Sequence, residues 1–211
     1  MRQRLQRGLY AITDGDIAER ERLLQSTEAI LAAGVAALQY RDKHTAQQER
    51  LLRAEGLQAL CRRYNVPFII NDDIRLAHEL AADGVHIGAD DPDYLSARRL
   101  LGDDAIIGVS CYNRLERALG AQQQGVDYIA FGAFFDTSSK QGTVHASPEL
   151  LREARRHLKI PIVAIGGITP DNGGSLIAAG ADLLAVISGI YHAATPGRAV
   201  AQYNQLFTQP R

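Results

Sequence analysis

The chain has 211 residues, of which 46% are hydrophobic, and a formal net charge of −1 at pH 7. This length is at the short end for one (β/α)₈ domain and excludes such a barrel joined to a second domain. The near-neutral charge gives no global attraction to nucleic acid or to an anionic membrane, and no apolar run is long enough to span a bilayer. We therefore expect one domain over 1–211, with residues 1–7 as an N-terminal tail.

Eight short apolar runs recur along the sequence, and nearly all of them end in polar or glycine residues. The runs are Gly8–Asp14, Ala37–Arg41, Pro67–Asp72, Gly84–Gly88, Ile106–Ser110, Tyr128–Gly132, Pro161–Gly167 and Leu183–Ser188. Helical periodicity is expected over 20–34, 45–65, 73–82, 92–102, 113–125, 147–158, 170–180 and 197–207. Eight buried strands that alternate with helices predict an α/β fold, a single (β/α)₈ TIM barrel. Its active site should lie at the C-terminal ends of the strands.

The segment 134–147 is polar for most of its length, contains glycine and follows the sixth predicted strand. Long loops in compact domains are commonly functional, and this one lies on the active-site side of the predicted barrel. We interpret it as an active-site lid; the alternative is an inert surface loop.

Cys61 and Cys111 are the only cysteines, and they stand far apart, without the spacing of a metal site. We expect both thiols to be reduced, which fits a cytoplasmic protein.

An amide and two cations stand at the end of the second strand. Side chains alternate along a strand, so Gln39, Arg41 and Lys43 should project in the same direction. Such a cluster suits a polyphosphate ligand. Taken alone it also fits a solvated loop.

Carboxylates follow the third and fourth strands, at Asp72–Asp73 and at Asp90–Asp91. Carboxylates from adjacent strand ends can converge on a hard cation such as Mg²⁺, which takes oxygen ligands and often bridges substrate phosphates. Asp73 and Asp91 also precede helical stretches, so helix capping is the alternative. We favour Asp72 and Asp91 as the metal ligands.

A second anion site is predicted after the last two strands. Gly166–Gly167 and Ser188–Gly189 occupy the position at which many barrels bind phosphate through backbone N–H groups. The segment Thr137–Lys140 could close over the same pocket. Two phosphate zones and a metal site indicate two phosphorylated substrates, or one substrate that carries both groups.

An ordered set of motifs between about residue 8 and residue 190 resembles the thiamine phosphate synthase family. The motifs are Tyr10–Asp14, Gln39–Lys43, Ile70–Asp72, Gly84–Gly88 with Asp91, Gly108–Ser110, Thr137–Lys140, Ala164–Gly167 and Val186–Ser188. The resemblance implies a transferase that joins 4-amino-2-methyl-5-hydroxymethylpyrimidine diphosphate to 4-methyl-5-(2-phosphooxyethyl)thiazole. The products would be thiamine phosphate and pyrophosphate.

The resemblance also implies roles for individual residues. Contact with the pyrimidine diphosphate is implied for Gln39, Tyr40, Arg41, Asp42, Lys43, Asn71, Ser110 and Lys140. Contact with the thiazole phosphate is implied for Thr137, Ser138, Ser139, Gly167, Ile187 and Ser188. Asp72 and Asp91 would hold Mg²⁺, and Arg41, Lys43, Ser110 and Lys140 would take part in catalysis. The sequence departs from the usual family pattern at Ala133, Asp136 and Ser138–Ser139.

Two other functions fit parts of this pattern. A thiazole tautomerase of the same superfamily would keep the barrel and the thiazole-phosphate pocket but need not keep the pyrimidine-diphosphate set. A non-catalytic phosphate sensor would need only the glycine and serine anion site. The synthase is favoured by the presence of Arg41, Lys43, Asn71, Asp72, Asp91 and Lys140. The oligomeric state, including a homo-oligomer, stays open.

Two aromatic residues near the predicted site have ordinary explanations. His86 lies inside the fourth strand, where barrel packing or support of the site is a better interpretation than proton transfer. Tyr10 lines the floor of the site or simply packs in the barrel.

Overall fold

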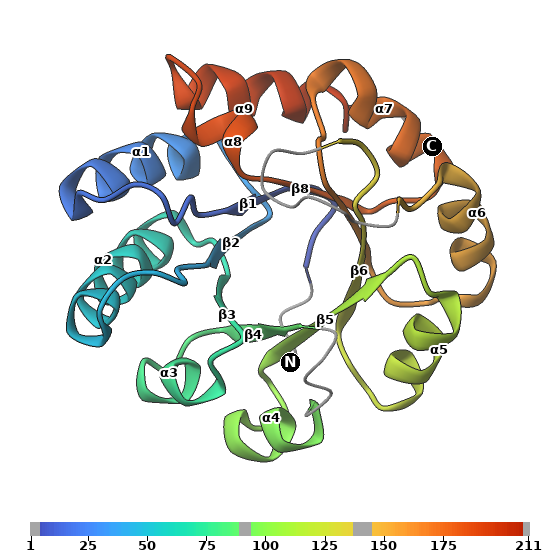
Figure 1. The fold of residues 1–211 in the computed structure, drawn as a ribbon, viewed down its shortest axis with the longest axis horizontal. Coiled ribbons are helices and arrows are strands. Elements are labelled where there is room, and N and C mark those ends of the chain that lie inside the picture. The colour runs from blue at the N-terminus through green and yellow to red at the C-terminus, as the bar shows by residue number, and fades with distance from the viewer. Residues whose placement is uncertain (1–4, 89–93, 137–144, 209–211) are drawn as a thin grey trace.

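A computed structural model of the chain shows eight parallel strands closed into a barrel and surrounded by helices (Figure 1). It describes residues 5–88, 94–136 and 145–208. Each strand pairs in parallel with the next, and the barrel closes where β8 pairs with β1, Gly8 standing opposite Leu183. The predicted (β/α)₈ fold is confirmed.

The described strands and helices follow the predicted order closely. The strands are β1 (Gly8–Ile12), β2 (Ala37–Tyr40), β3 (Phe68–Asn71), β4 (Gly84–Ile87), β5 (Ile106–Tyr112), β6 (Tyr128–Phe131), β7 (Ile162–Ile165) and β8 (Leu183–Val186). The helices are α1 (Arg20–Ala32), α2 (Gln47–Tyr64), α3 (Ile74–Glu79), α4 (Tyr94–Leu101), α5 (Leu115–Gln123), α6 (Pro148–His157), α7 (Pro170–Ala179), α8 (Ser188–Tyr191) and α9 (Pro196–Gln205). The short helix α8 was not expected from the sequence.

The strands bury side chains on both faces, which explains why they read as continuous apolar runs. In β1, Leu9 and Ala11 belong to the large core between barrel and helices, whereas Tyr10 and Ile12 belong to the smaller core inside the barrel. Leu5 also packs in this inner core and is only 8% exposed. The tail expected over residues 1–7 is therefore corrected at Leu5, because an apolar side chain fills the inner core there.

Aspartates at the N-terminal side of three even-numbered strands hold the neighbouring odd-numbered strands. The carboxylates of Asp83, Asp127 and Asp182 accept hydrogen bonds from the backbone N–H groups of Phe68 in β3, Ile107 in β5 and Ile162 in β7, at 2.8, 2.9 and 2.8 Å respectively. Arg98 of α4 and Arg155 of α6 pair with Asp127 and Asp182. These bonds lie at the end of the barrel opposite its C-terminal mouth.

Helix ends follow their sequence signals. Thr169 caps α7 through a reciprocal capping box with Asn172, as its position before a first-turn proline predicts. Gly34, Gly125 and Gly180, at the C-terminal ends of α1, α5 and α7, all have positive φ, as is common for glycine at this position.

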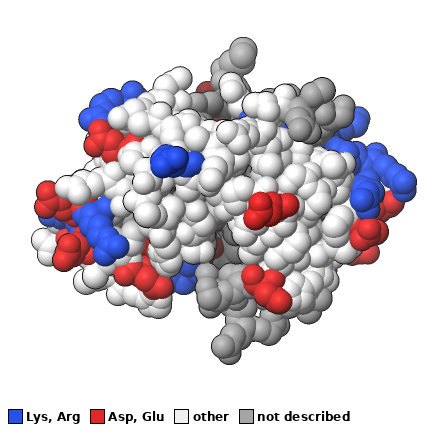
Figure 2. Space-filling view, turned by 90° about the horizontal axis from the view of Figure 1, so that it is seen from above, with Lys and Arg blue, Asp and Glu red and all other residues white. Residues whose placement is uncertain are grey.

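Charges of both signs are interspersed on the face drawn in Figure 2. Among the helices that the structure describes, none has the length and hydropathy needed to cross a bilayer. Cys61 and Cys111 are both buried with free thiols.

Candidate active site

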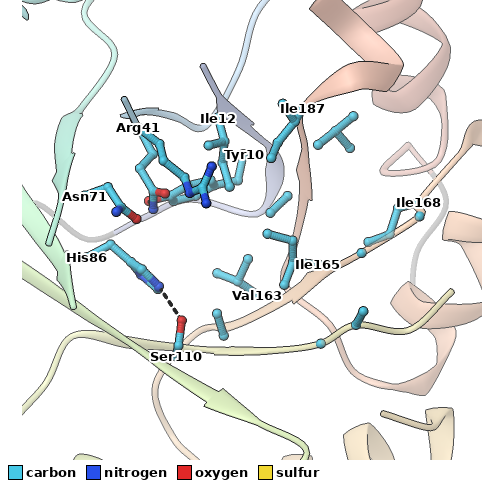
Figure 3. A pocket seen from close by; sticks show the side chains of 18 of the residues that line it. Tyr10, Ile12, Arg41, Asn71, His86, Ser110, Val163, Ile165, Ile168 and Ile187 are labelled. Carbon is cyan, nitrogen blue, oxygen red and sulfur yellow. Dashed lines mark hydrogen bonds between the residues drawn. The ribbon is translucent and has the colours of Figure 1, made fainter. Parts of the chain in front are cut away.

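A cavity of about 730 Å³ opens at the C-terminal ends of the strands, and every strand contributes to its lining. Its two sides differ in chemistry. Figure 3 shows Arg41, Asn71, His86 and Ser110 on one side and apolar side chains that include Val163, Ile165 and Ile187 on the other. The cavity can therefore receive a ligand that is charged at one end and carries an apolar ring.

The end of β2 directs two cations and an amide into the cavity. Gln39, Arg41 and Lys43 all line it, as strand alternation predicts. The intervening Tyr40 and Asp42 point away from the cavity: Tyr40 is 2% exposed within the outer core, and the Asp42 side chain is 1% exposed. Direct contact of these two side chains with a ligand in the cavity, as implied by the resemblance, does not fit this placement.

Asp42 instead organises the loop that carries Arg41 and Lys43. Its carboxylate accepts hydrogen bonds from the backbone N–H groups of His44 and Thr45, at 3.2 and 3.0 Å, and from the Tyr40 hydroxyl. Although burial opposes the change, these hydrogen bonds lower the pKa of Asp42. The carboxylate is therefore held ionised inside the loop.

Arg53 of α2 joins this loop to the loop that follows β1. Its guanidinium lies 3.3 Å from the Asp42 carboxylate and donates 3.1 Å to the carbonyl of Ile17 and also to the carbonyl of Ala18. The Arg53 side chain is 4% exposed. This buried ion pair holds two loops at the mouth of the barrel together.

Asp72 lies at the rim in a left-handed conformation, with φ of 62°. One carboxylate oxygen accepts from the backbone N–H of Gly88 at 2.9 Å, and the other accepts from Asn71 Nδ2 at 2.7 Å. Asp73 caps α3 through Leu76 N–H, so for Asp73 the capping alternative is confirmed. Asp91, the other predicted metal ligand, lies outside the described residues.

A second, more open groove adjoins the cavity between the ends of β2 and β3. Lys43, Asn71 and Asp72 line both spaces. Asp42, Arg50, Asp73 and Arg75 line the groove but not the cavity. The side of the cavity that carries Lys43 thus opens toward this groove.

Gly166 and Gly167 follow β7, line the cavity and have φ of 106° and 60°. A Cβ on Gly167 would lie 2.4 Å from the carbonyl oxygen of Asp136, and one on Gly166 would lie 2.5 Å from Ala133 Cβ. The two glycines therefore make room for the segment after β6, which donates from Phe134 and Phe135 to Ile165 and Gly166. The sequence predicted that an anion would approach these glycines closely. In the structure, the backbone of the segment after β6 lies there.

The opposite wall of this zone comes from β8 and α8. Ile187, Ser188 and Gly189, all singled out from the sequence, line the cavity near its mouth. The remaining predicted residues, Thr137, Ser138, Ser139 and Lys140, lie outside the described residues. Ala146 N–H, near the end of the expected lid 134–147, donates a 2.8 Å hydrogen bond to the carbonyl of Ala133, the residue before the lid.

A continuous hydrogen-bonded relay, which we call the central relay, crosses the barrel and lines the cavity. It comprises Gln39, Tyr10, Tyr128, His86 and Ser110 in that order, with successive distances of 3.1, 2.7, 2.9 and 2.9 Å. Burial lowers the pKa of His86 to about 4, against an opposite effect of Asp72, and burial raises the pKa of both tyrosines. All members of the relay are therefore neutral near pH 7.

Several lining residues were not found by sequence reasoning, chiefly apolar and aromatic ones. They are Ile12, Tyr112, Tyr128, Ala130, Val163, Ile165, Ile168, Thr169 and Ala185. Cavity-lining residues of β6, β7 and β8 stand two residues apart, at 128 and 130, 163 and 165, and 185 and 187. Alternation of side chains, counted back from the strand ends, could have identified those that were missed. Tyr112 also stands two residues after Ser110, but it lies beyond the predicted end of this run at Ser110, and the structure extends β5 to Tyr112.

Comparison with known proteins gives consistent matches over nearly the whole chain. A family model described as thiamine monophosphate synthase matches residues 9–190. Proteins named thiamine-phosphate synthase from Nitrosococcus oceani and from an Azoarcus species are 49% and 51% identical, each over 201 residues. These alignments cover 95% of this chain and 93% and 97% of the two relatives.

Solved structures agree with these matches. A thiamine phosphate pyrophosphorylase from Pyrococcus furiosus has a TM-score of 0.84 and 33% identity, with 94% of each chain covered. Orotidine 5′-phosphate decarboxylase from Pyrococcus horikoshii has a TM-score of 0.69 at 18% identity, with 94% of this chain and 100% of that chain covered. The latter likeness concerns the barrel fold alone.

Proposed function

The chain belongs to the thiamine monophosphate synthase family and is a transferase that forms thiamine phosphate, and on this premise we propose how its cavity carries the reaction. The substrates are the pyrimidine diphosphate and the thiazole phosphate named above. The observation that carries the proposal is the division of one cavity into a cationic open side and an apolar wall.

The cationic side is where the diphosphate would bind. Arg41 and Lys43 line the cavity with Asn71, and Lys43 and Asn71 also line the adjoining groove. A guanidinium can bind phosphate oxygens with two parallel hydrogen bonds, and an ammonium adds a compact charge. We propose that Lys140 joins this set. The aminopyrimidine ring would then extend toward Gln39 and Ser110.

The same side has a carboxylate that suits Mg²⁺. Protein sites for this ion typically use one or two carboxylates together with substrate phosphates. Asp72 fits that pattern, because its carboxylate stands on the shared rim with Lys43. The described residues contain no group of three or more His, Cys, Asp or Glu able to enclose a metal, so substrate oxygens would complete the shell. When bound by Asp72 and Asp91, Mg²⁺ would add positive charge beside the diphosphate oxygens.

The thiazole phosphate would occupy the wall formed by the ends of β7 and β8. Gly167, Ser188 and Gly189 line this part of the cavity, where backbone N–H groups and a hydroxyl can hold a phosphate. Ile165 and Ile187 supply apolar contact for the thiazole ring. Thr137–Ser139 are proposed to contact the same phosphate.

The reaction is a dissociative substitution. The bond between the pyrimidine methylene carbon and the diphosphate oxygen breaks, and the thiazole nitrogen forms a new bond to that carbon. Arg41, Lys43 and Lys140 stabilise the charge that develops on the departing pyrophosphate, and the cavity holds the two substrates in line. The electron-rich aminopyrimidine stabilises the cation left behind, so no side-chain nucleophile is required.

Incubation with both substrates tests this function directly. We expect thiamine phosphate and pyrophosphate to form in equal amounts, and only when Mg²⁺ is present. Absence of product with both substrates and Mg²⁺ would overturn the function, and product formation that chelation leaves unchanged would overturn the metal proposal alone.

The two substrate zones should respond separately to mutation. We expect Lys43→Ala to weaken binding of the pyrimidine diphosphate about tenfold, because one charge-assisted contact is lost. Gly167→Ala should weaken binding of the thiazole phosphate by a similar factor. Its Cβ would lie 2.4 Å from the Asp136 carbonyl oxygen, so the backbone that is proposed to hold the phosphate would have to shift. Each variant should leave the other substrate's affinity nearly unchanged in calorimetric titrations. If both variants weaken both substrates equally, a single shared anion site must replace the two zones.

A further inference from the structure

The central relay links two side chains of the cavity that lie on different strands. Gln39 on β2 and Ser110 on β5 are its ends, and Tyr10, Tyr128 and His86 connect them inside the barrel. Tyr10 and Tyr128 are each 1% exposed and His86 is 7% exposed. All five residues line the cavity. The polar atoms of Tyr10, Tyr128 and His86 are engaged within the relay, whereas Gln39 and Ser110 each keep a polar group that the relay does not use.

A relay of this kind has a direction. Each tyrosine hydroxyl and the neutral imidazole have one proton to donate. If every one of these protons is used within the relay, the direction at one end determines the direction at the other. Gln39 Nε2 donates to the Tyr10 hydroxyl. The bonds between Tyr10, Tyr128, His86 and Ser110 are compatible with either direction. If each proton is used within the relay, Tyr10 donates to Tyr128, Tyr128 donates to His86 Nδ1, and His86 Nε2–H donates to Ser110 Oγ.

The two ends consequently present opposite polarity to the cavity. In this direction Ser110 Oγ accepts from His86, so the proton of Ser110 is left for a ligand lone pair. The Gln39 amide donates into the relay, and among the described residues none donates to its Oε1. We propose that His86, Tyr128 and Tyr10 are positioning residues that fix Ser110 as a donor and Gln39 Oε1 as an acceptor, and thereby select an aminopyrimidine over its oxo analogue.

The chemical basis for this selection rests on the proposed function. A 4-aminopyrimidine has an N–H donor on its amino group and an acceptor on the neighbouring ring nitrogen. In the 4-oxo analogue both are reversed, since the carbonyl oxygen accepts and the ring N–H donates. A site with fixed polarity penalises the analogue because buried polar groups are left unpaired.

The tautomer of His86 is the first test, and it needs no substrate turnover. Long-range ¹⁵N–¹H NMR spectra of the ¹⁵N-histidine-labelled protein distinguish the Nε2–H from the Nδ1–H form. We expect Nε2–H for His86, assigned by its loss in His86→Gln. Observation of Nδ1–H would reverse the whole relay and overturn the proposal.

Discrimination between ligands is the second test. We expect the wild-type protein to bind the 4-amino pyrimidine diphosphate at least about tenfold more tightly than the 4-oxo analogue. Tyr128→Phe and His86→Asn should each reduce this ratio about tenfold, because Ser110 is then free to accept or donate. His86→Gln, whose longer amide can still donate toward Ser110, should keep the ratio within about threefold of wild type.

Tyr191→Phe is the matched control. It removes a hydroxyl of similar burial that bonds to Thr27 at 2.8 Å, and Tyr191 does not line the main cavity. We expect its ratio to equal that of wild type. An unchanged ratio in Tyr128→Phe, or an equal loss in Tyr191→Phe, would overturn the proposal. Failure of the wild-type protein to form thiamine phosphate, with the Nε2–H tautomer and the ligand preference intact, would overturn the proposed function alone.

Discussion

Replacing Asp72 by asparagine is expected to lower kcat at least about a hundredfold, the effect typical of losing one electrostatic contact to a developing charge. The substitution keeps the shape of the side chain. Asparagine tolerates the left-handed region, so the φ of 62° at this position should persist. Its amide oxygen can still accept from Gly88 N–H, a 2.9 Å bond in the native protein. The charge proposed to hold Mg²⁺ is the principal loss. Steady-state assays across a Mg²⁺ titration measure the effect.

Asp73→Asn provides the neighbouring control. Asp73 caps α3 and pairs with Arg50 at 2.6 Å, and it lines only the outer groove, not the main cavity. Asparagine is also a good N-cap, so the helix should remain and kcat should stay near the native value. Equal kcat values for Asp72→Asn and the unmutated protein at every Mg²⁺ concentration would remove Asp72 from the metal site.

Replacing Arg53 by methionine is expected to lower the free energy of unfolding by about 3–5 kcal/mol, the range for breaking a buried ion pair on one side. Asp42 would remain with its side chain 1% exposed and without its cation. The carbonyls of Ile17 and Ala18 would lose their donor as well. Urea unfolding followed by circular dichroism measures this change.

Two further variants identify the cause of that loss. Arg53→Met combined with Asp42→Asn should recover part of the lost stability, because no unpaired charge is then buried. Arg152→Met removes an arginine of an exposed pair, with side chains 56% and 74% exposed, and should change stability little. If Arg53→Met were no more destabilising than Arg152→Met, the buried pair would not hold the two loops.

The sequence predicted the barrel and the cationic strand end because both follow from local periodicity. Alternation placed Gln39, Arg41 and Lys43 on one face correctly. The same rule, applied strictly, would have turned Tyr40 and Asp42 outward. The resemblance instead assigned the whole run to substrate contact, because it concerns a motif and not the direction of each side chain.

The features that sequence reasoning missed depend on contacts between distant segments. Tyr10 and Tyr128 are 118 residues apart, yet their hydroxyls lie 2.7 Å from one another. Gly166 and Gly167 were identified as special, but the space that they leave is filled by the segment after β6. Periodicity cannot reveal what fills such a space. The helix α8, with four residues, is also too short to show a helical period.

The aspartates before β4, β6 and β8 lie at the end of the barrel opposite the active site, so strand alignment and catalysis depend on different ends of the barrel. Asp83, Asp127 and Asp182 secure the starts of the neighbouring strands at one end, while the reacting groups stand at the other. Loops at the mouth can therefore be exchanged, lengthened or recoded without loosening strand alignment. A barrel built in this way can diverge readily: related proteins can acquire new substrates through changes in the loops at the C-terminal end, while the bonds at the N-terminal end stay the same.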